Sequence, residues 1–318
     1  MSAVISEETF DDLLHATLEH LIAHGRLIAP TKGAALEDTA VLLQLANPRS
    51  RLSRSAKRST IVSCIGELAW YLSGSDDEET IAYYVPQYRR YAVGGKLLGA
   101  YGPRLFGGEG GGQVSRVISL LRSRPDTRQA VIQIFHQGDL ANDLLDLPCT
   151  CTLQFFVRES RLALVVTMRS NDAFVGLTHD LFAFTMIQEL VAVSLGLDLG
   201  TYSHFVGSLH LYNSDRDRAD AYLEDGWYFG ATASMPPMPV GDPWNSVRSF
   251  CQMEASIRTT PPDQISVDGI GRDYWGDLSR MLAAYRLKRT RPDSLDELVA
   301  ALADEFFEIY LTDRAFKE

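Results

Sequence analysis

The chain of 318 residues carries a formal net charge of −11, and 46% of its residues are hydrophobic. It can therefore bury a large core, but its acidic balance excludes a broad nucleic-acid interface, which would need a basic surface. A few arginines could still surround one small phosphate, so we expect a small anionic ligand and no nucleic-acid partner.

The sequence contains no apolar run long enough for a membrane helix, and residues 1–9 are acidic and polar where a secretion signal would be basic and then apolar. We therefore expect a cytoplasmic protein without a membrane partner. The cysteines, Cys64, Cys149, Cys151 and Cys251, are too few and too irregularly spaced for a disulfide framework. A special cysteine here is expected to act as a thiol.

Helical periodicity is evident at two places in the first part of the chain. Apolar residues at helical spacing over 10–21 predict an amphipathic helix, with Gly25 as its C-terminal cap. A second apolar helix is predicted over 61–72, ending at Gly74. This second helix contains one carboxylate, Glu67, on an apolar background.

The middle of the chain is typical of a sheet. The glycine-rich segment 107–112 lacks a P-loop lysine and a preceding strand, so we interpret it as a loop without chemistry. Short runs of β-branched and aromatic residues predict strands at 130–135, 153–157, 162–168 and 202–206. Together with the helices, these strands predict an α/β fold with a mixed sheet.

The last predicted elements are helical. Residues 181–195 are apolar nearly all round and precede a glycine, as in a helix at the centre of a protein. A passage rich in proline and glycine, 235–244, precedes a helical segment with apolar positions over 299–310. The predicted organisation is a single catalytic domain, 1–318, with a helical extension from about residue 245.

Several motifs that carry chemistry follow one another along the chain. In order they are Gly66–Gly74 (GELAWYLSG), Pro125–Arg128 (PDTR), Leu147–Cys151 (LPCTC) followed by Gln154-Phe155, Met168–Asp172 (MRSND), Gly176–Asp180 (GLTHD) and Gly207–Tyr212 (GSLHLY). Over about residues 61–212 they resemble the signature of the thymidylate synthase family, in order and at similar spacings.

The resemblance implies one α/β domain, with a mixed sheet flanked by helices and a homodimer formed through that sheet. It also implies a pyrimidine nucleoside monophosphate as substrate, 5,10-methylenetetrahydrofolate as co-substrate, and no metal.

Cys149 is the predicted nucleophile. A cysteine after a proline is usually a small core residue. Carbon 5 of a pyrimidine, however, becomes nucleophilic only after a thiolate has added to carbon 6, and Arg169 would lower the pKa of such a thiol. Strand alternation would put Cys151 on the same face, so a Cys-x-Cys metal pair is the alternative. No second cysteine or histidine pair stands at zinc-like spacing.

The resemblance assigns the phosphate site. Arg169 and Ser170 would hold the 5′-phosphate, and Arg128 would reach it from the partner subunit, because a guanidinium can bind a phosphate through two parallel hydrogen bonds. The second partner arginine of the family is Gln129 here. The N-terminal arginine of the family has no clean counterpart, and Lys32 is the predicted substitute.

The resemblance also assigns the sugar and the proton transfers. His210 and Tyr212 would hydrogen-bond the 3′-hydroxyl, and Gln154 would belong to the substrate site. Glu67 would act as a general acid and base through water, since a buried carboxylate needs partners or a catalytic task.

For the folate, the resemblance implies a contact from Asp172, which a turn or cap role would explain equally well. Where the family stacks an indole on the pterin, this chain has no tryptophan, and Tyr88 or Tyr91 is the predicted substitute. We also expect Tyr101 to contact the folate.

Asp180 departs from the family pattern, which has asparagine at this position. The asparagine amide donates to the uracil carbonyl at carbon 4 and accepts from ring nitrogen 3, whereas cytosine presents an amine at carbon 4. A carboxyl group fits cytosine, and the substitution resembles the (deoxy)cytidylate hydroxymethylases of the superfamily. A helix N-cap before Leu181 is a structural alternative.

Two further departures agree with hydroxymethylation. Residues 313–318 do not contain the family's closing tail, so water could reach the transferred carbon, and Thr150 replaces a histidine. The sequence therefore predicts a covalent Cys149 adduct that converts CMP or dCMP to its 5-hydroxymethyl derivative. The alternatives are a methylase of a uridylate (dUMP or UMP) and a nucleotide-binding dimer without catalysis.

Overall fold

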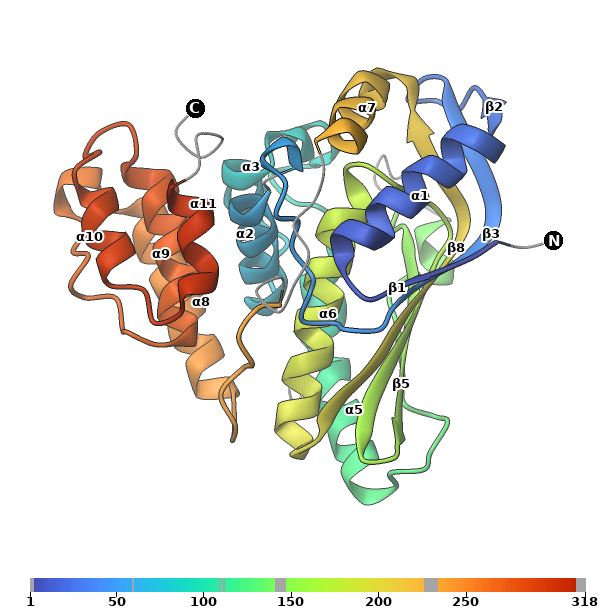
Figure 1. Ribbon diagram of the computed structural model, residues 1–318. Helices are drawn as coiled ribbons and strands as arrows, with labels where there is room; N and C mark the ends of the chain where they lie inside the picture. Colours follow the sequence, from blue (N-terminus) through green and yellow to red (C-terminus); the bar gives the residue numbers. More distant parts are fainter. Residues whose placement is uncertain are drawn as a thin grey trace.

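The computed structural model describes residues 3–58, 60–108, 110, 112–140, 147–225 and 234–312. Figure 1 shows three layers, with the sheet on one side, α6 and α2 in the middle, and the C-terminal helices on the other side. Among the described residues, no helix combines the length and the apolar composition needed to cross a membrane.

The sheet is mixed, which confirms the predicted fold class. Its strands follow the order β1-β3-β8-β6-β5-β4, while β2 pairs with β3 and β7 pairs with β8. Neighbours β3 and β8 are antiparallel, β8 and β6 are parallel, and β6 and β5 are antiparallel. The strands are β1 (Val4–Glu7), β2 (Arg26–Ile28), β3 (Ala35–Leu45), β4 (Val131–Gln133), β5 (Thr150–Arg158), β6 (Arg161–Met168), β7 (Asn171–Asp172) and β8 (Asp198–Tyr212).

The α-helices lie on one face of this sheet and beyond it. Helices α1, α5 and α6 share a core with the strands, whereas α2 packs with the C-terminal helices in a second core. The helices are α1 (Phe10–His24), α2 (Ile61–Leu72), α3 (Glu78–Tyr84), α4 (Tyr101–Phe106), α5 (Gly112–Ser123), α6 (Gly176–Leu195), α7 (Arg216–Glu224), α8 (Trp244–Thr259), α9 (Tyr274–Leu287), α10 (Ser294–Ala300) and α11 (Glu308–Thr312).

Helix α6 belongs to both cores, and this explains its uniform hydrophobicity. Phe184 and Ile187 pack in the sheet core, while Phe182 and Met186 pack in the second core. The helix ends before Gly196, whose φ of 70° is the left-handed conformation of a glycine cap. The predicted central helix is therefore confirmed, although it begins five residues earlier than expected, at Gly176 instead of Leu181.

The other predicted elements agree with the structure to different degrees. The prediction over 61–72 matches α2, and the strand predicted over 202–206 is the middle of the much longer β8. Strand β3 was missed because its first half is polar. The segment 299–310 is not one helix, because α10 ends at Ala300 and a short 3-10 helix precedes α11.

The opposite face of the sheet carries partly exposed apolar side chains. Phe205 on β8 is 36% exposed, and Phe156 on β5 and Val165 on β6 are half-buried. Their neighbours in each strand point to the helix side and are buried, as strand alternation requires.

Helix α8 begins at Trp244, close to the expected start of the helical extension. The organisation as a single catalytic domain stays a prediction. The expected absence of a closing tail concerns residues 313–318, which lie outside the described residues, as do 109 and 111 of the glycine-rich loop.

Candidate active site

A β-hairpin brings the predicted nucleophile beside Arg169. Strands β5 and β6 are joined by Glu159 and Ser160, both with positive φ, as in the tight turns that match strand twist. This turn sets a register in which Thr150 lies opposite Met168, so the residues just before β5 meet those just after β6. The Arg169 backbone N–H accordingly donates to the Cys149 carbonyl at 2.8 Å.

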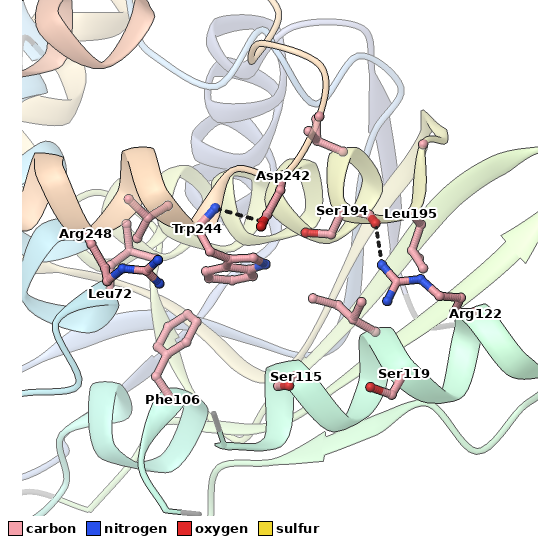
Figure 2. Close-up of a pocket in the computed structure, with 15 residues that line it drawn as sticks. Leu72, Phe106, Ser115, Ser119, Arg122, Ser194, Leu195, Asp242, Trp244 and Arg248 are labelled. Carbon is pink, nitrogen blue, oxygen red and sulfur yellow. Dashed lines mark hydrogen bonds between the residues drawn. The ribbon is translucent and has the colours of Figure 1, made fainter. Parts of the chain in front are cut away.

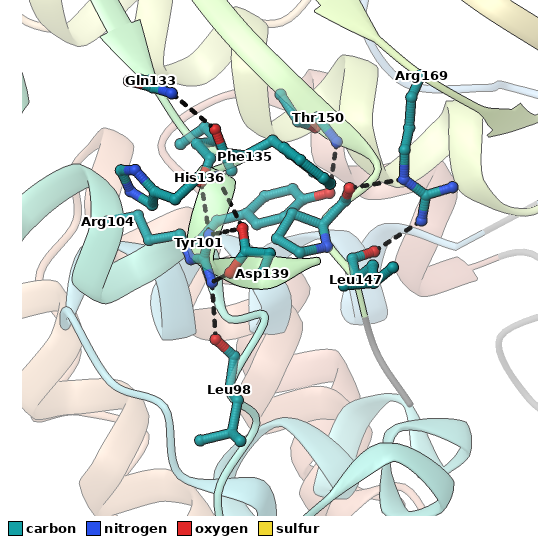
Figure 3. A network of polar contacts seen from close by, with 12 residues as sticks. Leu98, Tyr101, Arg104, Gln133, Phe135, His136, Asp139, Leu147, Thr150 and Arg169 are labelled. Atoms are coloured by element: carbon teal, nitrogen blue, oxygen red, sulfur yellow. Dashed lines mark hydrogen bonds and ion pairs between the residues drawn. The ribbon is translucent and has the colours of Figure 1, made fainter. Parts of the chain in front are cut away.

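The Arg169 side chain also binds the segment that leads into β5. Its Nε donates to the Pro148 carbonyl at 2.9 Å and its Nη2 to the Leu147 carbonyl at 2.8 Å (Figure 3). These bonds use two of the five N–H donors of the guanidinium, so three are left for an anion. Gly207 permits the approach of β8, because a side chain there would meet the Arg169 carbonyl at 2.9 Å.

Cys149 itself lies before β5 and is half-buried. The alternation that we assumed for Cys149 and Cys151 is not present, because Cys149 is outside the strand and the register shifts between Thr150 and Thr152. Among the described residues, no group of three or more His, Cys, Asp or Glu side chains is arranged to hold a metal ion.

Tyr101 lies behind the nucleophile at the start of α4. Its hydroxyl accepts a hydrogen bond from the Thr150 backbone N–H at 3.2 Å (Figure 3). Burial and the neighbouring Asp180 and Cys149 groups raise the pKa of Tyr101 well above its usual value. Tyr101 therefore remains a neutral phenol between the nucleophile and α6, as well as being a candidate for contact with the folate.

A bidentate ion pair fixes α4. Arg104 donates to both oxygens of Asp139, at 2.6 and 2.7 Å, and to the Ile134 carbonyl at 2.6 Å (Figure 3). The hydrogen bonds from Arg104 lower the pKa of Asp139 despite its partial burial. Because Arg104 follows Tyr101 by one helical turn, this ion pair also positions Tyr101.

Glu67 lies inside α2 and is 5% exposed. Its Oε1 accepts from the hydroxyls of Tyr71, at 2.8 Å, and Tyr88, at 2.5 Å. Burial and the negative charge of Glu67 raise the pKa of Tyr71, so this phenol stays protonated and donates. Tyr71 was missed in the sequence, although its spacing of four residues from Glu67 on a helix was a usable signal.

Asp180 lies in the second turn of α6 and is not an N-cap. The cap position is Val175, without a side-chain hydrogen bond, so the structural alternative for Asp180 was wrong. Its Oδ2 accepts from Asn171 Nδ2 at 2.7 Å. Burial, reinforced by the charge of Glu67, raises the pKa of Asp180 to about 8 although the Asn171 hydrogen bond opposes the shift.

Asp172 does have a turn role. Its Oδ1 accepts from the backbone N–H groups of Phe174 and Val175, at 2.9 and 3.2 Å, and so shapes the entry to α6. Parallel pairing of β7 with β8 also sets Asp172 beside His210. Burial raises the pKa of Asp172, and the turn hydrogen bonds oppose that shift.

His210, Tyr212 and Lys32 gather at the end of β8. The rings of His210 and Tyr212 meet edge to face with centroids 4.8 Å apart. Lys32 Nζ lies 5.0 Å from the centroid of the Tyr91 ring. Burial works against the charged form of Lys32, but the hydrogen bond to Tyr91 and the acidic groups of Tyr91, Tyr212 and Cys149 raise its pKa. A cation therefore lies near the nucleophile.

Two predicted substrate residues lie elsewhere within the protomer. Gln154 Nε2 donates to the Arg128 carbonyl at 2.9 Å, and both residues lie where β4 meets β5. Gln154 follows Cys149 by five residues, most of them in β5, and five extended residues span up to about 17 Å. Within one protomer, Gln154 and the Arg128 backbone that it holds therefore lie along β5 from the nucleophile. Ser170, by contrast, directly follows Arg169 and is half-buried.

The mixed-sheet fold and the group of site residues around Cys149 define a family. The sequence model of the thymidylate synthase family matches residues 45–234, and the chain belongs to this family. It is a folate-dependent one-carbon transferase that modifies a nucleotide.

Two relatives illustrate the range of the family. A thymidylate synthase of Francisella philomiragia is 28% identical over 185 residues, which cover 53% of this chain and 68% of that protein. A deoxyuridylate hydroxymethyltransferase of Delftia phage PhiW-14 is 26% identical over 248 residues, which cover 73% of this chain and 69% of that protein.

Proposed function

We propose that this enzyme transfers a one-carbon unit to carbon 5 of a cytidylate, CMP or dCMP, through a covalent Cys149 adduct, and that water completes the reaction to the 5-hydroxymethyl product. The observation that carries the choice of base is Asp180, a carboxyl group where the family has an amide, with a pKa raised to about 8 by burial. At neutral pH most of this carboxyl group is therefore the neutral acid.

A neutral acid is both a donor and an acceptor. Its O–H can donate to ring nitrogen 3 of cytosine while its other oxygen accepts from the exocyclic amine. Asn171 donates to Oδ2, which supports a proton on Oδ1. As the thiolate adds to carbon 6, nitrogen 3 becomes more basic, and Asp180 can transfer its proton there.

Cys149 forms the bond to carbon 6, and Arg169 and Lys32 supply the positive charge that favours its thiolate. Arg169 and Ser170 bind the 5′-phosphate, with Lys32 as a further cation. His210 and Tyr212 bind the sugar hydroxyl. These roles follow the motif positions. They are supported by the backbone contact between Arg169 and Cys149 and by the contact between the His210 and Tyr212 rings.

Glu67 handles protons through water beside the pyrimidine. Two phenols donate to one of its oxygens, which keeps the carboxylate oriented within the buried helix. It can accept the carbon 5 proton through a water molecule and then orient the water that adds to the transferred carbon.

The residues around the site suit a folate. Tyr88 and Tyr91 offer rings for a planar pterin, Tyr101 lies beside the nucleophile, and Asp172 offers a carboxyl group. When bound, 5,10-methylenetetrahydrofolate supplies a carbon at the oxidation level of formaldehyde. Addition of water to that carbon gives a hydroxymethyl group without any hydride transfer.

A homodimer would complete the site. The sheet face that carries Phe156, Val165 and Phe205 is partly exposed and apolar, as a surface for a second copy would be. The Arg128 backbone is bound by Gln154, which is five residues beyond Cys149 in the β5 region, and this supports a contribution of Arg128 to the partner's phosphate site. In this assembly Gln154 acts by holding the Arg128 backbone.

A uridylate is the second candidate substrate. A neutral acid can also pair with uracil in the reverse sense, by donating to the carbonyl at carbon 4 and accepting from nitrogen 3. The named activity of the phage relative, a deoxyuridylate hydroxymethyltransferase, favours this candidate.

The deciding experiment incubates the full chain with CMP, dCMP, UMP or dUMP and methylenetetrahydrofolate, followed by mass spectrometry. We expect a cytidylate product heavier by CH₂O. A product from uridylates alone would contradict the proposed base, and a gain of CH₂ would contradict the use of water.

A further inference from the structure

Figure 2 shows a cavity of about 810 Å³. It lies at the C-terminal end of α6, whereas Asp180 is near the start of that helix. It is lined by the last turn of α6, one side of α5 and the segment that enters α8, together with Leu72 and Phe106. The 15 residues from Asp180 to Leu195 correspond to about 22 Å along a helix. The cavity therefore lies away from Asp180, although Leu72 in its lining directly follows Tyr71 on α2. Its volume is within the usual range for a small-molecule site.

The cavity combines aromatic rings with cations. The rings of Phe106 and Trp244 have centroids 6.2 Å apart, and Figure 2 shows both rings between Arg122 and Arg248. Arg122 Nη2 donates to the Ser194 carbonyl at 2.8 Å, and Arg248 Nη2 donates to Asn245 Oδ1. Each contact uses one of five N–H donors, so both guanidinium groups retain donors for a ligand.

The local charge is opposite to that of the whole chain. Two arginines line the cavity against one carboxylate, Asp242, which accepts from the Trp244 backbone N–H at 3.2 Å. The hydroxyls of Ser115 and Ser119 line the α5 side. Rings suit a planar group, and guanidinium and hydroxyl groups suit phosphate or carboxylate oxygens. We propose that this cavity binds a small aromatic anion, whose chemistry is shared by nucleotides and by the 4-aminobenzoylglutamate part of a folate.

Three helices connect this cavity to the candidate active site. Helix α2 carries Glu67 and Tyr71 and ends in the cavity at Leu72. Helix α4 begins at Tyr101 and ends in the cavity at Phe106, while α6 runs from the Asp180 end to the cavity. A ligand that shifts these helix ends would also shift the residues at their other ends, so occupancy should alter turnover. This second part of the proposal rests on the proposed function.

Binding can be tested without turnover. Calorimetric titrations would use AMP and CMP in one arm and 4-aminobenzoyl-L-glutamate in the other. The proteins would be the full chain, its Arg169→Ala variant, the double variant Arg122→Ala/Arg248→Ala, and Arg116→Ala as an exposed control on the same helix, α5, outside the cavity.

We expect at least one probe to bind the Arg169→Ala and Arg116→Ala variants like the wild type. We expect the double variant, with its melting temperature unchanged, to bind that probe at least tenfold more weakly. Binding of a nucleotide or of 4-aminobenzoyl-L-glutamate then identifies the ligand class. Absence of binding in both arms, or equal binding by the double variant, would overturn the site.

Coupling is tested by kcat/KM with AMP, which carries no pyrimidine to be modified. We expect saturating AMP, or aminobenzoylglutamate if that is the probe that binds, to change kcat/KM at least twofold in the wild type and not in the double variant. Unchanged turnover with an occupied cavity would overturn the coupling. A lack of cytidylate turnover would instead affect the proposed function alone.

Discussion

Helix α6 contains two carboxylates in opposite electrostatic environments. Asp180, near its start, has another carboxylate, Glu67, as its main charged neighbour, and burial raises the pKa of Asp180 to about 8. Glu189, farther along, is fully buried but accepts from Arg49 Nε at 2.7 Å and from Arg51 Nη2 at 2.5 Å. Burial alone would raise the pKa of Glu189, but the two arginine charges lower it.

This difference in partners distinguishes a carboxylate that is buried for stability from one that is suited to catalysis. Glu189 also accepts from the Met238 backbone N–H at 3.1 Å, so it joins α6, the segment before α2 and the segment that leads to α8. Arg49 and Arg51 compensate the charge of Glu189, which therefore contributes to the stability of the fold. Asp180 instead has the neutral amide of Asn171 as its hydrogen-bond partner and the carboxylate of Glu67 as its charged neighbour. A carboxyl group that titrates near neutral pH is suited to proton transfer.

The largest expected effect is at the nucleophile. Cys149→Ala should lower turnover by on the order of 10⁴-fold or more, because no covalent adduct can form. It should also abolish folate-independent exchange of the carbon 5 proton, measured by NMR in deuterated water. Cys151→Ala is the matched control and should retain measurable activity. Exchange that survives in Cys149→Ala would exclude the covalent mechanism.

The next effect concerns Glu189. Glu189→Gln should lower the free energy of unfolding by about 3–5 kcal/mol, because Arg51 is left buried without its charged partner. The stability from this group is present above the unfolded-state pKa and is lost as pH falls through the lowered folded-state pKa. Denaturant titrations should therefore show that the free energy of unfolding of the wild type falls toward that of the variant at acidic pH. Asp180→Asn is the control on the same helix, and a similar loss in it would remove the contrast.

A shared site predicts complementation between subunits. Arg128→Ala should weaken nucleotide binding by about 1.5–3 kcal/mol, since one charge-assisted phosphate contact is lost. Mixing weakened Arg128→Ala subunits with inactive Cys149→Ala subunits should raise activity above that of either variant alone, because one hybrid site would contain both residues. No recovery after verified subunit exchange would argue against the shared site.

The choice of base is tested by Asp180→Asn. A mispaired buried polar group costs about 1–3 kcal/mol, so preference for cytidylate over uridylate should fall roughly 5- to 150-fold. The measurement is the ratio of kcat/KM values for the two substrates. An unchanged ratio would mean that Asp180 does not recognise the base.

The smallest effect is in the pH profile. If the neutral acid is the active form, kcat/KM for cytidylate should decline as pH rises through about 8, by roughly tenfold per unit well above that pKa. The descending limb should be missing in Asp180→Asn. The same limb in both proteins would assign the titration to another group.

Local patterns in the sequence were sufficient for several elements. The periodicity of 61–72 and the apolar run before Gly196 predicted α2 and the end of α6, because helical repeats and caps are short-range properties. The motif order was sufficient for the family, and it singled out Cys149, Glu67 and Arg169. Polar strand β3 was not predictable in this way, because its identity depends on pairing with β8, more than 150 residues away.

Only the tertiary structure decided the electrostatics. The sequence left Asp180 open as a helix cap, but α6 begins at Gly176, four residues before Asp180. The Asp180 carboxyl group is therefore affected by burial and by the charge of Glu67, and does not cap the first backbone N–H groups. Lys32 from the N-terminal part of the chain lies over the Tyr91 ring, and Arg51 reaches Glu189 across 138 residues. A pKa depends on desolvation and on charges from distant segments, and neither is encoded in local spacing.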